Sequence, residues 1–146
     1  MASLIEILSA DGNRPVLVRA CCGLIDDEVA RKSGLKGLAV KAGFKAIRAI
    51  KPGFIADMVD NLFDEFVDKL EPFYGAWLAE STGSFSQYLL ARDREVADCL
   101  LRVTDARART TKLATVKKLY LRLRPAAEGH VREALPGMGR IMDAHI

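Results

Sequence analysis

The chain has 146 residues, of which half are hydrophobic and 28% are charged, and its formal net charge is +3. A domain of this length buries about 70% of the surface of its unfolded chain, so residues 1–146 are expected to form one domain with its own core. This composition excludes an intrinsically disordered chain, and a core of this size needs no disulfide framework.

Three features bear on the compartment. Cys21, Cys22 and Cys99 form no CxxC or Cys/His cluster, and free buried thiols are typical of a reducing cytoplasm. The N-terminus lacks the basic segment and long apolar run of a secretory signal. The longest charge-free run, residues 81–91, is about half of the ~20 residues that a spanning helix needs. We therefore expect a soluble, cytoplasmic protein that is not transmembrane, with no metal and no cofactor.

In the first half of the chain, apolar residues recur at spacings of three and four and almost never alternate, which predicts helices rather than strands. The segments 11–13, 33–34 and 51–53 have the Gly, Pro and Asp residues typical of helix ends. Pro72 is expected to kink or end the fourth helix. The helices predicted here cover residues 3–9, 15–32, 35–50 and 54–71.

In the second half, the aromatic segment PFYGAW at residues 72–77 is expected to pack beneath the elements that follow it. A loop is predicted at residues 80–84, a break near residues 110–111 and a boundary at Pro125. The helices predicted here cover residues 85–91, 96–103, 113–123 and 126–144, the last bent near residue 136. The fold class is therefore all-α, a compact bundle of about six to eight helices.

The turn Lys51-Pro52-Gly53 separates a basic helix from an acidic one. Between Glu28 and Asp57 there are seven Lys or Arg and no carboxylate, whereas the following helix carries acidic residues at spacings of three and four. If these helices fold back antiparallel as a hairpin, three oppositely charged pairs come level and predict a charge ladder. The pairs are Lys41 with Asp64, Lys45 with Asp60, and Arg48 with Asp57. The alternative is that both stripes are solvated, since exposed ion pairs contribute only ~0 to 1 kcal/mol.

The basic helix at residues 35–50 is expected to use its cations inside the protein. A basic stripe beside an equal acidic one is a poor surface for nucleic acid, because phosphate binding needs unopposed charge. A helix that lies in a membrane surface would also need larger hydrophobic side chains than the four alanines and two glycines of this helix.

A second basic segment, residues 107–124, contains no carboxylate. Lys118 and Arg122 share one helical face, and Tyr120 is the only aromatic residue available for base stacking. The segment is either a helix with solvated cations or an anion-binding module for nucleic acid or acidic lipid. Its seven cations are Arg107, Arg109, Lys112, Lys117, Lys118, Arg122 and Arg124.

Residues with catalytic chemistry are not grouped in the sequence. His130 and His145 would lie ~22 Å apart in one straight helix, too far to share a metal or a substrate. The glycines near residue 37 do not match a phosphate-binding loop, and the candidate nucleophiles Ser84, Ser86 and Cys21 have no nearby basic or orienting partner in the sequence. We therefore expect no enzyme and no catalytic residue.

Apolar residues suggest two further hypotheses. The segments PFYGAW and GSFSQYLL give the chain more hydrophobic surface than one core can hide, which favours protein–protein contacts or a homo-oligomer. A helical pocket for a small apolar ligand is the other possibility, with core packing as its alternative. Its candidate residues are Phe63, Phe66, Phe73 and Trp77.

Four segments occur in an order that resembles a family of small helical bacterial proteins of unknown function. They are SLIEILS, KSGLKGLAVKAGFKAIRAIKPGF, VTDARAR and LRPAAEGHVREALP. The resemblance extends over nearly the whole chain. It implies a compact helical cytoplasmic domain, and it assigns no functional residue.

Overall fold

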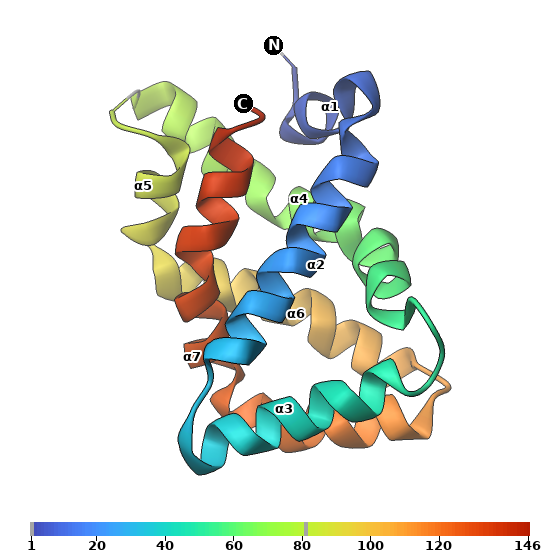
Figure 1. Ribbon diagram of the computed structural model, residues 1–146. Helices are drawn as coiled ribbons and strands as arrows, with labels where there is room; N and C mark the ends of the chain where they lie inside the picture. The colour runs from blue at the N-terminus through green and yellow to red at the C-terminus, as the bar shows by residue number, and fades with distance from the viewer. Residues whose placement is uncertain (1, 81) are drawn as a thin grey trace.

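The computed structural model describes residues 2–80 and 82–146, and within them it contains helices and no strand, which confirms the all-α class (Figure 1). Ser81, in the predicted loop at residues 80–84, lies outside the described residues. The elements are α1 (Leu4–Ser9), the 3-10 turn η1 (Ala10–Gly12), α2 (Asn13–Arg31), α3 (Gly34–Arg48), α4 (Phe54–Glu80), α5 (Phe85–Leu90), α6 (Asp93–Thr110) and α7 (Ala114–Asp143).

Most helices begin where the sequence predicts a cap or a turn. The hydroxyl of Ser3 accepts a hydrogen bond from the Glu6 N–H at the start of α1. Ser84 and Gln87 form a reciprocal capping box at the start of α5, in which each side chain accepts from the other residue's backbone N–H. Gly53, with φ of 73°, allows the chain to turn sharply before α4.

Pro72, expected to kink or end a helix, and Pro125, expected to mark a boundary between two helices, both lie inside a helix instead. α4 continues through Pro72 to Glu80, and α7 continues through both Pro125 and Pro136. Each proline removes one backbone hydrogen bond and favours a kink, but the helix is kept where its sides are packed. Figure 1 shows α7 bending sharply between a first arm (residues 114–124, orange) and a second arm (residues 126–143, red). The two predicted C-terminal helices are therefore the arms of one bent helix.

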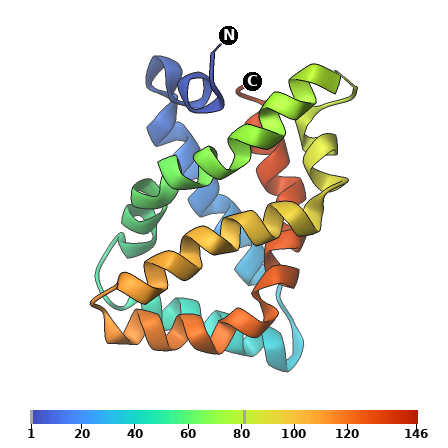
Figure 2. The same ribbon diagram turned by 180° about the vertical axis from the view of Figure 1, so that it is seen from behind.

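The helices form two packed layers and a third, crosswise one. Figure 2 shows α4 and α6 lying across α2 and the second arm of α7, while α3 and the first arm of α7 lie side by side beneath them. The core is formed where α1, α2, α4, α5, α6 and the second arm of α7 meet. Its buried residues include Leu4, Leu8, Leu17, Phe63, Leu70, Tyr74, Phe85, Leu89, Val96 and Leu135.

The predicted antiparallel pairing of α3 with α4 is not found. The two helices diverge from the turn at residues 51–53, and α3 instead lies along the first arm of α7 (Figures 1 and 2). Gly43 makes this close approach possible, because a Cβ at this position would lie 3.1 Å from Cδ1 of Leu123. Both chain termini lie at the end of the molecule opposite to α3 (Figure 1).

Candidate functional site

The acidic residues of the predicted charge ladder have other partners. Asp60 and Asp64 both accept hydrogen bonds from the guanidinium of Arg14, whose Nε lies 3.1 Å from Asp60 Oδ1. The hydrogen bond with Asp64 is the largest cause of a raised pKa for Arg14. Asp57, in the first turn of α4, pairs at 3.0 Å with Lys51 of the preceding turn. The predicted pairing is therefore wrong, because α2 rather than α3 lies beside this acidic side of α4.

The basic residues of the ladder make no ion pair with a described residue of α4. Arg48 pairs with Asp26 of α2. Lys41 and Lys45 are exposed and make no ion pair with any residue that the structure describes. These two lysines are therefore free to meet a partner from outside, contrary to the expectation that the cations of this helix act inside the protein.

The first arm of α7, which carries most of the second basic segment, docks on α6 around the carboxylate of Asp105. Asp105 accepts hydrogen bonds from Arg124 Nε at 2.8 Å and from the hydroxyl of Tyr120, which also lies 2.7 Å from the Thr104 hydroxyl. The hydrogen bond from Arg124 lowers the pKa of Asp105, and burial partly opposes this shift. This cluster holds the first arm of α7 against α6.

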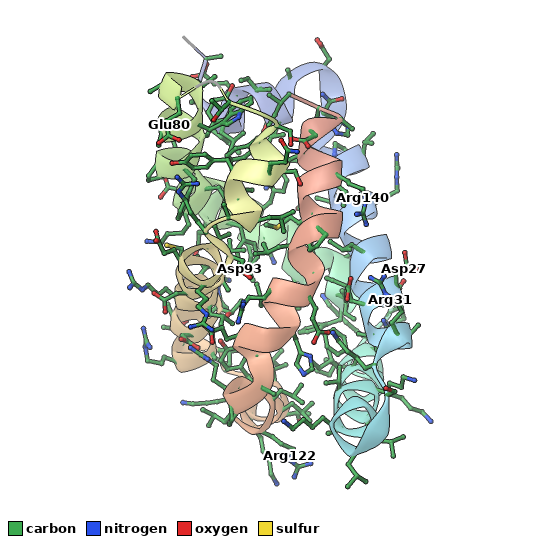
Figure 3. The ribbon with its side chains drawn as sticks, turned by 90° about the vertical axis from the view of Figure 1, so that its left-hand side faces the viewer. Asp27, Arg31, Glu80, Asp93, Arg122 and Arg140 are labelled. Carbon is green, nitrogen blue, oxygen red and sulfur yellow. The ribbon has the colours of Figure 1, made fainter. Side chains whose placement is uncertain are left out.

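The remaining cations of this segment are mostly unpaired. Arg107 pairs with Glu65 of α4 at 3.1 Å. The other five are exposed and have no ion-pair partner among residues 2–80 and 82–146. Figure 3 shows Arg122 pointing away from the body of the molecule at its lower end. The five are Arg109, Lys112, Lys117, Lys118 and Arg122.

We call residues 34–53 and 106–124 the basic layer: they comprise α3, the first arm of α7, the turns that adjoin these two helices, and the C-terminal residues 106–110 of α6 (Figures 1 and 2). The basic layer contains twelve of the 22 Lys and Arg and none of the 19 Asp and Glu. Its formal charge is therefore +12, and the rest of the chain carries −9. The exposed cations of the layer without an ion pair to a described residue are Lys36, Lys41, Lys45, Arg109, Lys112, Lys117, Lys118 and Arg122.

Exposed leucines gather on the same layer. Four of the seven large hydrophobic side chains exposed in the described chain lie there: Leu35 (87% exposed), Leu38 (64%), Leu121 (63%) and Leu113 (43%). At 100° per residue, Leu35 and Leu38 lie on the side of α3 opposite to the buried Val40. Leu35 and Leu38 were visible in the sequence. They were not considered when the four alanines and two glycines of this helix were weighed against a membrane surface.

The four candidates for an apolar pocket pack in or against the core. Phe63 is buried, and Phe66, Phe73 and Trp77 are partly buried against the core cluster. The indole N–H of Trp77 donates to the Gly83 carbonyl at 3.2 Å. None of the four lines either of two surface hollows, of about 440 and 260 Å³. The larger hollow adjoins the basic layer and is lined by Lys32, Ser33, Gly34, Leu35, Leu38 and Lys41.

The described residues hold no group of three or more His, Cys, Asp or Glu that could bind a metal ion. His130 has both ring nitrogens buried without a hydrogen-bond partner among residues 2–80 and 82–146. Burial lowers its pKa, and the nearby charges of Lys32 and Lys36 lower it further, against an opposing effect of Glu133. In the part of the chain that the structure describes, no helix is long and apolar enough to cross a membrane.

Comparison with known proteins places the chain in a family. No curated protein and no solved structure shows significant similarity to it. Residues 4–146 match a family of unknown function, DUF6918, which agrees with the resemblance noted from the sequence. Because the match extends over almost the whole chain, this protein belongs to the family of unknown function DUF6918.

Proposed function

We propose that this protein is a non-enzymatic, cytoplasmic binding module that attaches to an anionic partner through the basic layer. The observation that carries the proposal is the set of eight exposed cations without an ion pair among the described residues, in a layer that contains no carboxylate. Outside this layer carboxylates outnumber cations, so the positive charge belongs to one end of the molecule rather than to its whole surface.

The separation of charge favours an external partner on physical grounds. Like charges on one layer repel each other and destabilise the folded chain, and an anionic partner relieves that repulsion. Asp60 and Asp64 of α4, which the sequence places next in the chain, pair with Arg14 of α2 and not with the layer. Two other carboxylates of α4, Asp57 and Glu65, each pair with one cation of the layer, and eight exposed cations keep no ion pair with a described residue. Lys118 and Arg122 lie on the exposed side of the first arm of α7. Both are well placed for such a partner.

Association between copies of the chain receives less support. The segments that suggested it contribute Tyr74, Phe85 and Leu89 to the core, so they leave little apolar surface for a second copy. A symmetric dimer through the basic layer would bring two layers of charge +12 together. A protein partner with an acidic face remains within the proposal, because it offers the same complementary charge.

The test is binding of the purified protein to heparin, a polyanion without bases or lipid chains. We expect binding at ~50 mM salt that weakens at least about tenfold at ~200 mM, because counterion release makes such binding steeply salt-dependent. The double variant Lys118→Glu with Arg122→Glu is expected to weaken binding at ~50 mM salt by at least about tenfold.

A matched control exists outside the layer. Arg19 on α2 and Lys69 on α4 are exposed and have no ion pair with described residues, so Arg19→Glu with Lys69→Glu changes the net charge by the same amount. We expect this variant to keep most of the binding. Equal loss in both double variants, or no heparin binding at low salt, would refute the proposal.

A further inference from the structure

We infer that the anionic partner is the surface of an acidic lipid membrane, on which the protein lies with its basic layer down and with Leu35 and Leu38 inserted among the headgroups. This inference rests on the proposed function and names the partner. Its basis is that the exposed leucines and the unpaired cations occupy the same layer.

The leucines distinguish a membrane from the other anionic partners. Leu35 is 87% exposed and Leu38 is 64% exposed, and neither gains anything from contact with phosphates or sulfates. Apolar surface is stabilised only where it leaves water. An acidic membrane offers both chemistries at once, because its anionic headgroups lie directly above hydrocarbon.

The arrangement of α3 suits an interfacial helix. Its buried side, with Val40 and Ile47, packs on the protein, and its opposite side carries both leucines. Lys45 lies two turns after Leu38 on nearly the same side of α3, and Lys41 lies about 60° around the helix from Leu38, at 100° per residue. Long lysine side chains can place their ammonium groups among the headgroups while their methylene stems follow the apolar surface.

The first arm of α7 repeats this pattern beside α3. Leu121 is 63% exposed, and Lys118 and Arg122 are exposed next to it. Figure 3 shows the first arm at the lower end of the molecule, with Arg122 directed downward and away from it. Two neighbouring helices therefore present leucines and cations at one end, as a surface rather than a single point.

Nucleic acid fits the same layer less well. Binding of single strands relies on aromatic rings that stack on bases. Tyr120, the aromatic residue of the first arm, is held by its hydroxyl to Asp105 and Thr104 and is half-buried. Phe44 lies 5.9 Å below the guanidinium of Arg48, which is itself paired with Asp26. Neither ring is free to stack on a base.

The first experiment compares ligands by sedimentation and anisotropy. We expect the protein to bind phosphatidylcholine vesicles that contain phosphatidylserine more tightly than it binds pure phosphatidylcholine vesicles or a random-sequence DNA duplex. The double variant Leu35→Ser with Leu38→Ser is expected to weaken vesicle binding about tenfold while heparin binding stays unchanged. The control variant, Val16→Ser with Ile146→Ser, replaces two exposed apolar residues outside the layer and is expected to bind vesicles normally.

A second variant reports insertion directly. The chain has one tryptophan, Trp77, so Leu38→Trp in a Trp77→Phe background places a single indole on the basic layer. We expect its emission to shift to the blue on acidic vesicles and to be quenched by brominated lipid, because the ring leaves water for the headgroup layer.

The outcomes separate this inference from the proposed function. Loss of all anion binding refutes both. Heparin or DNA binding without vesicle binding agrees with the proposed function and refutes the membrane as the partner. Insertion of the leucines is refuted if the variant Leu35→Ser with Leu38→Ser binds vesicles as tightly as the wild type. It is also refuted if the emission of Leu38→Trp does not shift on vesicles.

Discussion

Replacement of Gly139 by alanine probes the closest contact between the second arm of α7 and α5. A Cβ at Gly139 would lie 2.8 Å from the Cβ and 3.2 Å from the Cα of Ser86. The second contact is with backbone, so a rotamer change of Ser86 cannot relieve it and the helices must separate. Overpacking of this kind costs ~1–3 kcal/mol. Alanine regains ~1 kcal/mol of helix propensity, so we expect a net loss of up to ~2 kcal/mol in the free energy of unfolding.

Gly129 of the same helix supplies the matched control. No heavy atom lies within 4 Å of a Cβ built there, so Gly129→Ala gains helix propensity without a clash. We expect it to stabilise the protein by ~0.5–1 kcal/mol. Urea unfolding followed by circular dichroism measures both variants. Gly139→Ala is expected to lower Tm by several degrees, since 1 kcal/mol corresponds to ~2–4 °C for a domain of this size.

A variant of Ser86 tests the same contact from the side of α5. Ser86→Gly removes the Oγ and the Cβ, the two atoms nearest to the new methyl group, so the double variant Gly139→Ala with Ser86→Gly is expected to recover part of the lost stability. Gly139→Ala as stable as Gly129→Ala would show that α5 and α7 do not approach this closely. No recovery in the double variant would show that the loss has another source.

Three further predictions concern ionisable groups. The pKa of His130 is lowered chiefly by burial, so the unfolded chain takes up a proton there more readily than the folded chain as pH falls below ~6.5. The free energy of unfolding should therefore fall from pH 7 to 5.5, and by less in His130→Gln. Burial raises the pKa of Cys21 to about 11, so its alkylation at pH 8 should be about a hundredfold slower than in urea. The pKa of Asp105 is lowered mainly by Arg124, so this pair should stabilise the fold above pH ~4 and lose its effect as Asp105 is protonated in more acidic solution. Asp105→Asn should therefore cost ~1 kcal/mol at pH 7, measured by urea unfolding.

Each of these predictions can be contradicted by one result. An unchanged pH dependence in His130→Gln would remove His130 as a source of acid sensitivity. Equal alkylation of Cys21 in native and unfolded protein would show that its thiol is not held in an apolar site. An Asp105→Asn variant with wild-type stability at pH 7 would show that the cluster with Arg124 and Tyr120 adds nothing to the docking of α7.

Helical periodicity was enough to predict the class of fold, because most helices bury a regular apolar side. The prolines were misjudged for a physical reason: a local rule says that Pro72 and Pro125 interrupt a helix, but it does not weigh packing on both sides of the interruption. The tertiary contacts of α4 and α7 hold the chain helical through each proline. Local propensity is a weak guide where such contacts exist.

The charges of the site were visible in the sequence, but their partners were not. Asp60 pairs with Arg14, which lies 46 residues away in the chain, and no helical repeat connects the two. Exposed ion pairs are worth too little to choose the packing of helices, so they follow it. Leu35 and Leu38 were overlooked because a helical wheel does not say which of two apolar sides is buried. Only the packing of Val40 and Ile47 decides that.

The separation of +12 on the basic layer from −9 on the rest of the chain gives the molecule a large electric dipole along its length. A net charge of +3 would only draw the protein toward an anionic surface. The electric field of that surface also exerts a torque on the dipole of the protein. Within about one Debye length, ~8 Å at physiological salt, that torque turns the basic layer toward the surface before any side chain touches it. The first collision with such a surface is then made by the basic layer.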